Sequence, residues 1–156
     1  EGTVEDAERY GAAVERALAR WDELLPHPLL GRHRGQLKRL ERGVLAEATV
    51  RYHEIDGQFR SGVIVAPHEL AIKDHPMCRL VVVRPVASLD DCLRFLHPGV
   101  ATIGVYPEER RHALRDRVAA RGVSNIVPLG HGGAAAIGCA HDGMLVLSEL
   151  VDWKNG

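Results

Sequence analysis

The chain has 156 residues, of which 46% are hydrophobic and 26% charged, a composition typical of a globular protein that can bury a core. Its net charge of -1 excludes the strong positive charge expected of a protein that binds nucleic acid or an anionic membrane. The sequence has no apolar run near the roughly 20 residues that cross a bilayer, and no signal peptide. We therefore expect a protein with no membrane span and no nucleic-acid partner, and its three widely spaced cysteines favour the reducing cytoplasm.

The first half of the chain predicts two helices and a β-hairpin. Thr3 and Asp6 have the spacing of a capping box, and the helix that follows should end before Pro26. A second helix is expected over residues 34–47. Strands over 48–55 and 58–65 flank an Asp-Gly turn, which is a strong hairpin signal. The first helix should bury a stripe of small and apolar residues: Val4, Ala7, Gly11, Val14, Leu18, Trp21 and Leu25.

The second half alternates strands and helices, a pattern that predicts parallel strands joined by crossovers. Leu114 and Val118 should face inward from the helix in which Pro107 occupies the first turn. We expect an α/β fold, a mostly parallel sheet with flanking helices plus a β-hairpin, in a single domain over residues 1–156. The expected elements are strands over 79–86, 101–105 and 124–128, a helix opened by a capping box over 88–91, and a last helix over 144–153.

The segment 130–143, Gly-His-Gly-Gly-Ala-Ala-Ala-Ile-Gly-Cys-Ala-His-Asp-Gly, is the strongest candidate for a ligand site. It holds five of the sixteen glycines, two of the nine histidines and one of the three cysteines. It follows the carboxyl end of the last predicted strand, where ligands bind in open parallel sheets. Its glycines permit a close approach of backbone to ligand.

Several chemistries can be compared for this loop. Gly130, Gly132 and Ala135 partly match a dinucleotide fingerprint, but that motif belongs to a first βαβ unit, and too little chain follows here. His131, Cys139 and His141 form only one cluster, whereas structural zinc sites draw on two close pairs, so we expect no metal.

Other polar residues have simple structural interpretations. Asp142 is placed to cap the last helix, with or without a further role in a site. Cys78, Cys92 and Cys139 are odd in number and widely spaced, which argues against disulfides, and packing accounts for each. Four further histidines have no evident partner in the sequence and are expected to be surface or capping residues: His53, His68, His75 and His97.

Three segments of the chain together resemble a known family. They are Cys-Arg-Leu-Val-Val-Val-Arg-Pro-Val with Ser-Leu-Asp-Asp (78–91), Ala-Thr-Ile-Gly-Val with the later Gly-Val-Ser-Asn-Ile-Val-Pro-Leu-Gly (101–130), and His-Asp-Gly followed by Leu147 and Glu-Leu-Val-Asp-Trp (141–153). This pattern is similar to the carboxyl-terminal part of the LuxC-type acyl-CoA reductases, which belong to the aldehyde dehydrogenase superfamily. The resemblance covers about half of the chain, from residue 78 to 153.

The resemblance implies the catalytic-domain fold of an aldehyde dehydrogenase and the reduction of acyl-CoA or another acyl thioester to the aldehyde. A cysteine thiolate would form an acyl-enzyme, and NADPH or NADH would supply the hydride. It also implies a possible homo-oligomer, because members of the superfamily often dimerise through this half. The acyl thioester substrate and the nucleotide-binding part of the same enzyme would be the partners of this chain.

The chain departs from the superfamily pattern in two places. The nucleophile of the superfamily precedes the helix that opens this chain, and the segment 74–77 does not match the Glu-x-Phe motif that contacts the cofactor ribose. Since the chain begins with Glu1 and not methionine, we expect a piece of a longer protein. Because the resemblance implies that this carboxyl-terminal fragment lacks the nucleophile and most of the cofactor site, we expect it to be inactive alone and to bind no cofactor tightly. A non-enzymatic α/β module for binding or assembly is the alternative, and a small metal-dependent enzyme is a weaker one.

Under the first interpretation, the segment 130–143 forms one wall of the acyl site. His141 would orient the substrate or relay a proton, and Asp142 would hold the loop or the imidazole. Backbone N–H groups of the loop would steady the acyl carbonyl oxygen. The remaining residues expected to contact substrate are Gly132, Gly133, Cys139 and Gly143.

Overall fold

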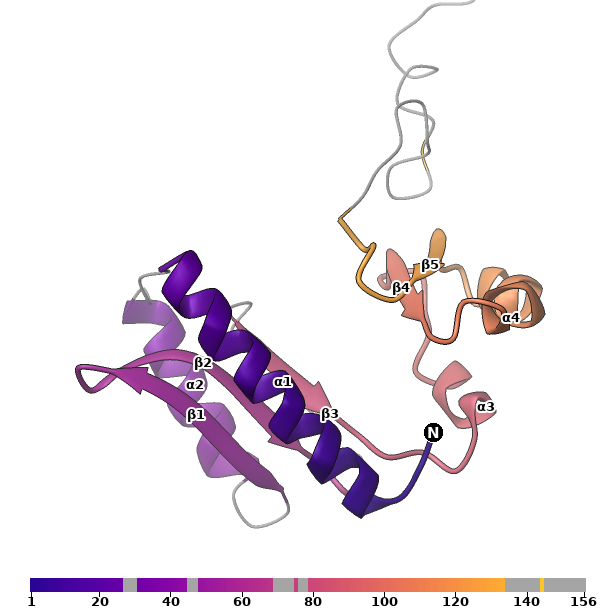
Figure 1. Ribbon diagram of the computed structural model, residues 1–156. Helices are drawn as coiled ribbons and strands as arrows, with labels where there is room; N and C mark the ends of the chain where they lie inside the picture. Colours follow the sequence, from indigo (N-terminus) through magenta and orange to yellow (C-terminus); the bar gives the residue numbers. More distant parts are fainter. Residues whose placement is uncertain (27–30, 45–47, 69–74, 76–78, 134–143, 145–156) are drawn as a thin grey trace, which may run out of the picture. The chain divides into compact units, whose positions relative to one another are not determined.

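The computed structural model describes residues 1–26, 31–44, 48–68, 75, 79–133 and 144. The described residues form both helices and strands, which agrees with the predicted α/β class, and the chain divides into two compact units, Glu1–Ser88 and Leu89–Gly156 (Figure 1). The first unit contains α1 (Val4–Leu24), α2 (Gly31–Val44), β1 (Thr49–Ile55), β2 (Gln58–Val65) and β3 (Leu80–Val83). The second contains α3 (Leu89–Leu93), β4 (Thr102–Val105), α4 (Arg110–Ala119) and β5 (Asn125–Pro128).

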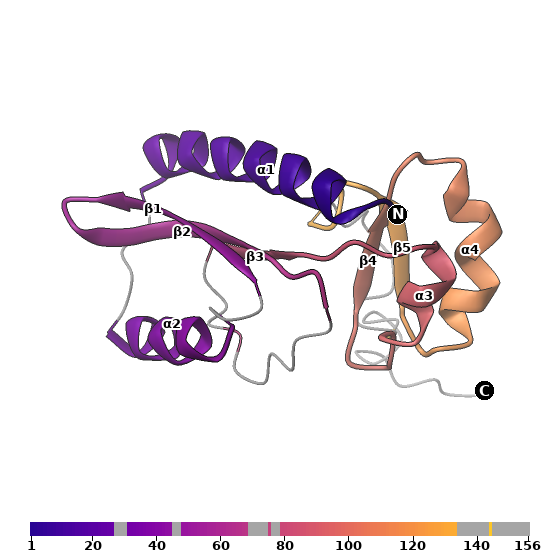
Figure 2. The same cartoon turned by 90° about the horizontal axis from the view of Figure 1, so that it is seen from below.

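The first unit is a three-stranded sheet between two helices. The strand order is β1-β2-β3, with β1 antiparallel and β3 parallel to the central β2. Helix α1 covers one face of this sheet and α2 covers the other (Figure 2). Because β2 is covered on both faces, it is the centre of the core, and Val63, Ile64 and Val65 have no exposed surface.

Each helix packs against its own set of sheet residues. The α1 face has a core of Ala7, Val63, Val65 and Val83, with Val14, Leu18 and Val81 beside it. The α2 face has a core of Leu37, Phe59, Ile64 and Leu80. The alternation of β2 side chains between these two layers is the period-two pattern of a strand.

The predicted hairpin is confirmed. Asp56 and Gly57 have φ angles of 53° and 67°, the left-handed backbone that the two central residues of a type I′ turn require. Glycine adopts this region without steric cost, and aspartate is among the residues that tolerate it best. The two-residue turn therefore sets the pairing of β1 with β2 at its tip, where Ile55 lies opposite Gln58.

The predicted capping box at the start of α1 is also confirmed. Thr3 Oγ1 accepts a hydrogen bond from the Asp6 backbone N–H at 3.2 Å, and the Asp6 carboxylate accepts one from the Thr3 backbone N–H at 2.9 Å. These two bonds satisfy donors that a helix terminus otherwise leaves unpaired.

Removal of the Thr3 hydroxyl should therefore destabilise the protein. We expect Thr3→Ala to lower the free energy of unfolding by about 1 kcal/mol in urea denaturation. Thr3→Ser keeps the hydroxyl and should stay close to wild type. Equal stability of the alanine variant and wild type would show that the capping box contributes nothing.

The second unit contains a parallel pair of strands, β4 and β5, in which Val105 lies opposite Pro128. Leu114 and Val118 face inward from α4, as predicted, and Gly122 follows the helix with a φ of 82°. The core of this unit consists of Leu93, Val105, Leu114, Val118 and Val123.

Several details of the predicted elements were wrong. Three residues of the stripe that α1 was expected to bury are about half exposed: Val4 at 48%, Trp21 at 53% and Leu25 at 56%. Strand β3 ends at Val83 and not at residue 86, and Pro107 precedes α4 by three residues after a cis peptide bond with Tyr106. The described strands form two sheets, one of three strands and one of two. The predicted last helix lies outside the described residues, except for Met144, which takes part in an isolated β-bridge.

Candidate functional site

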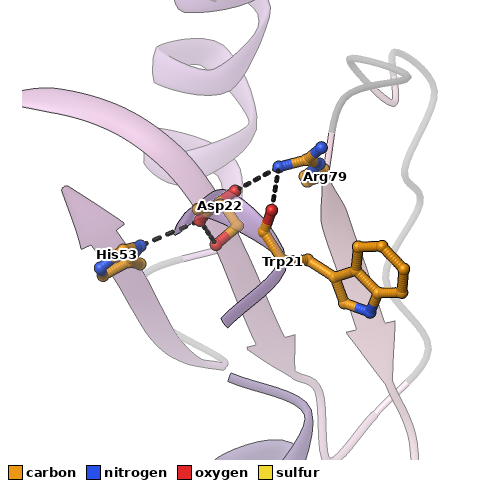
Figure 3. A network of polar contacts seen from close by, with 5 residues as sticks. Trp21, Asp22, His53 and Arg79 are labelled. Atoms are coloured by element: carbon orange, nitrogen blue, oxygen red, sulfur yellow. Dashed lines mark hydrogen bonds and ion pairs between the residues drawn. The ribbon is translucent and has the colours of Figure 1, made fainter. Parts of the chain in front are cut away.

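Four polar side chains meet on the α1 face of the three-stranded sheet, and we call them the Asp22 network: Asp22, His53, Ser61 and Arg79 (Figure 3). Asp22 Oδ2 accepts hydrogen bonds from Ser61 Oγ at 2.5 Å and from His53 Nδ1 at 2.9 Å. Asp22 Oδ1 accepts one from Arg79 Nη1 at 2.8 Å. One carboxylate therefore joins the last turn of α1 to β1, to β2 and to the residue that precedes β3.

Strand pairing brings the three partners of Asp22 into one row. His53 of β1 lies directly opposite Ser61 of β2. On the other side, Gly62 N–H donates to the Arg79 carbonyl at 2.9 Å, so Arg79 lies beside Ser61 just before β3 begins. Residues 53, 61 and 79 are far apart in the sequence, and only the register of the sheet makes them neighbours.

A β-bulge adjoins this row. Ser61 pairs with His53 and Phe59 pairs with Glu54, so β2 has one extra residue, Arg60, at this point. The bulge changes the alternation of β2: Phe59 packs in the α2 layer, whereas Ser61 faces Asp22 of α1. Bulges commonly redirect side chains next to functional sites, and this one directs Ser61 into the network.

Arg79 also neutralises an unfavourable feature of α1. An acidic side chain near the carboxyl end of a helix opposes the helix dipole, and the last turn of α1 contains Asp22 but no basic residue. Arg79 Nη1 donates to the Trp21 carbonyl at 3.3 Å as well as to Asp22. Its guanidinium therefore supplies, from another part of the chain, the positive charge that the end of the helix lacks.

The centre of the network is buried and its flanks are open. The side chain of Asp22 and the whole of Ser61 are each 1% exposed, whereas the side chains of Arg79 and His53 are 24% and 29% exposed. Burial raises the pKa of Asp22, but hydrogen bonds from Ser61, His53 and Arg79, together with the Arg79 charge, lower it further than burial raises it. The pKa of Asp22 is therefore below its ordinary value of 3.8, and the group is a carboxylate at neutral pH.

The geometry restricts what the network can do chemically. Ser61 and His53 both bond to Asp22, whereas in a hydrolase triad the histidine lies between serine and aspartate. The buried Ser61 hydroxyl is thus not an activated nucleophile. Because an ionised carboxylate only accepts hydrogen bonds, Nδ1 of His53 donates the hydrogen bond to Asp22.

This arrangement corrects one prediction and adds residues that the sequence reasoning missed. His53 was expected at the surface or in a cap, but it is a half-buried partner of Asp22. The buried stripe of α1 continues from Leu18 to Asp22, which is four residues further along the helix. The stripe was predicted to continue to Trp21, three residues further along. A polar residue in helical phase with a buried stripe was the signal that could have identified Asp22.

The residues predicted for the glycine-rich loop are only partly described. The loop leaves the parallel strands as predicted, because Leu129 N–H donates to the Val105 carbonyl at 3.0 Å just beyond the paired ends of β4 and β5. Gly132 and Gly133 are exposed, with no atom near the position of a Cβ. The other predicted site residues lie outside the described residues: Cys139, His141, Asp142 and Gly143.

The described part of the chain contains no group of three or more histidine, cysteine, aspartate or glutamate side chains arranged to hold a metal ion. None of its helices has the length and apolar character needed to span a membrane.

The relatives of the chain are reductases of acyl-protein thioesters. The chain is 37% identical over 79 residues to the long-chain acyl-protein thioester reductase of Vibrio harveyi, an alignment that covers 50% of this chain and 17% of the relative. It is 26% identical over 104 residues to long-chain acyl-protein thioester reductase 2 of Photobacterium leiognathi, covering 66% and 22%. For the Aliivibrio fischeri long-chain acyl-protein thioester reductase, the values are 29% over 101 residues, covering 64% and 21%.

This chain spans about a fifth of the length of these relatives. A family match covers more of this chain than the three alignments do. The model of the acyl-CoA reductase (LuxC) family matches residues 32–153, which include all of α2 but its first residue, every described strand and the glycine-rich loop. The chain therefore belongs to the acyl-CoA reductase (LuxC) family.

Proposed function

We propose that the chain is the carboxyl-terminal part of an enzyme that reduces acyl-CoA or another acyl thioester to the aldehyde with NADPH or NADH. The family match over residues 32–153 carries this proposal, and the three reductases of acyl-protein thioesters support it. The full-length enzyme would have the catalytic fold of an aldehyde dehydrogenase and form an acyl-enzyme on a cysteine.

The described residues do not themselves fit a dinucleotide. Such a site needs a glycine-rich turn from a strand into a helix, so that backbone N–H groups can approach the phosphates. Among the described residues, the turns from β3 into α3 and from β4 into α4, 84–88 and 106–109, contain no glycine. Glu108 and Glu109 would also repel a phosphate at the start of α4. The nucleotide would therefore be held by another part of the full-length enzyme.

We assign this chain a supporting role on one side of the acyl site. The Asp22 network holds α1 and the three strands in one arrangement, and the segment 130–143 begins beyond the paired ends of β4 and β5. The catalytic cysteine would lie outside this chain, so the chain alone should form no aldehyde.

The reaction can be tested directly on the full-length enzyme. With palmitoyl-CoA and NADPH or NADH, we expect palmitaldehyde in amounts equal to the nucleotide consumed, and none from the isolated chain. If the full-length protein consumed no nucleotide and formed no aldehyde with either nucleotide, the alternative of a binding or assembly module would replace the enzymatic proposal.

Among the residues of the glycine-rich loop, His141 has the proposed role that a single substitution tests most directly. In the full-length enzyme, His141→Ala should lower kcat for aldehyde formation about tenfold or more, because a group that orients substrate or moves a proton acts in the transition state. Thermal stability should stay close to wild type, which separates catalysis from folding. An unchanged kcat would leave His141 with no part in the reaction.

A further inference from the structure

The outer face of α2 carries a concentrated positive charge. Leu37 and Leu40 pack against the sheet, so the opposite face of the helix is open. Four basic side chains are exposed from it, and we call them the α2 stripe: Arg34, Lys38, Arg39 and Arg42. Arg34, Lys38 and Arg42 follow one another at intervals of four residues and so form one row about 12 Å long.

The α2 stripe is not explained by the stability of the helix. Like charges four residues apart destabilise a helix, and Arg34 near the amino end opposes the helix dipole; of the four residues, Arg42 in the last turn is favourably placed. The first turn of α2 contains no acidic residue. Within the described part of the chain, no carboxylate forms an ion pair with any of the four side chains. The helix has five Lys or Arg residues and one Glu, although the whole chain has a net charge of -1.

We propose that the α2 stripe docks an acidic carrier protein that presents the acyl group as a thioester. This inference rests on the proposed function, since a reductase of protein-bound thioesters must hold the protein as well as the acyl chain. Charge complementarity selects the partner: a row of exposed cations fits a surface rich in Asp and Glu and steers its approach. The stripe falls within the residues that match the LuxC family.

Two other anionic partners fit the observations less well. An amphipathic helix binds a membrane by inserting its apolar face, but Leu37 and Leu40 of α2 are packed against the sheet. A nucleic acid calls for a basic domain, and this chain is slightly acidic overall. The small row of charges is better matched to one helix or loop of an acidic protein.

The test compares two substrates with the same acyl chain, palmitoyl-CoA and a palmitoyl-loaded acyl carrier protein, in the full-length enzyme. The variant is Arg34→Glu with Lys38→Glu. The control is Arg16→Glu with Arg20→Glu, which reverses two exposed arginines at the same spacing on α1, on the other side of the sheet. Both variants change the net charge equally, so only the position of the change differs.

We expect the α2 variant to raise KM for the carrier-protein substrate about tenfold, with kcat and the KM for palmitoyl-CoA unchanged. The control should leave both substrates unaffected. In wild type, KM for the carrier protein should rise with added salt, and the α2 variant should have a weaker dependence, because salt screens exposed charges.

Several results would overturn the docking proposal. If the two variants raised KM for the carrier protein equally, the cause would be the net charge of the enzyme and not the position of the α2 stripe. A rise in KM for palmitoyl-CoA of the same size would assign the stripe to the coenzyme phosphates or to folding. An unchanged KM for the carrier protein would also end it. Each of these results requires turnover of palmitoyl-CoA by the wild type, so a failure of the enzymatic proposal is recognised separately.

Discussion

Replacement of Asp22 by asparagine is expected to lower the free energy of unfolding by about 3 kcal/mol. Asparagine has nearly the same volume, so the change removes the charge while leaving the packing. The change leaves the Arg79 guanidinium without its counter-charge. The three donors that share the two carboxylate oxygens of Asp22 would also have only the single oxygen of the amide to accept their hydrogen bonds. Equilibrium unfolding in urea at pH 7 measures the loss.

Asp90→Asn is the matched control. Asp90 also forms an ion pair with an arginine, Arg117, at 2.6 Å, but the two side chains are 64% and 48% exposed. Solvent screens such a pair, so its loss should lower the free energy of unfolding far less than the loss of the Asp22 carboxylate. If the two asparagine variants lost equal stability, burial would not be the reason that the Asp22 network contributes to the free energy of unfolding.

The contribution of Asp22 should also depend on pH in a defined direction. Its pKa in the folded protein lies below the ordinary value of 3.8, so the unfolded chain takes up the proton first as the pH falls. The stabilisation is therefore complete well above pH 4 and is lost as the pH falls through and below that value. We expect the difference in unfolding free energy between wild type and Asp22→Asn to be present in full at neutral pH and to shrink below about pH 4. A difference that grew on acidification would contradict the lowered pKa.

Gly11→Ala should lower the free energy of unfolding by about 1 to 3 kcal/mol, although alanine is the better helix former. Gly11 lies where α1 crosses β2, and a Cβ at this position would be 2.6 Å from Val65 Cγ2. Val65 has no exposed surface, so it has no room to move away. The added methyl group must displace the helix from the sheet.

Gly35→Ala is the control for this change, and we expect it to have the opposite sign. Gly35 is also within a helix, but the nearest atom to its Cβ position is Arg39 Nη1 at 3.7 Å, the end of a flexible side chain. With space available, the gain in helix propensity should stabilise the protein by about 1 kcal/mol. Both variants can be measured by urea denaturation at one pH. Stabilisation by Gly11→Ala would mean that α1 does not approach β2 as closely as the structure has it.

What could be predicted from the sequence was local. The capping box of Thr3 and Asp6 and the turn at Asp56 and Gly57 depend on contacts within four residues, so each motif specifies its own geometry. Apolar periods, the Asp-Gly turn and the capping boxes together predicted every described helix and strand, although several ends were displaced. The departure of the loop from the ends of β4 and β5 followed from the alternation of strands and helices.

The polar interior was decided by the tertiary structure alone. Trp21 and Asp22 are adjacent, and hydrophobicity favours burial of the tryptophan, yet the direction in which α1 crosses the sheet buries the aspartate. Burial of a carboxylate is favourable only when partners are in place, and its partners come from β1, β2 and the residue before β3. Their alignment depends on strand register and on the bulge at Arg60, which no local pattern specifies. The elements and the family resemblance thus follow from local patterns of residues, whereas the Asp22 network requires the packing of segments that lie up to 57 residues apart.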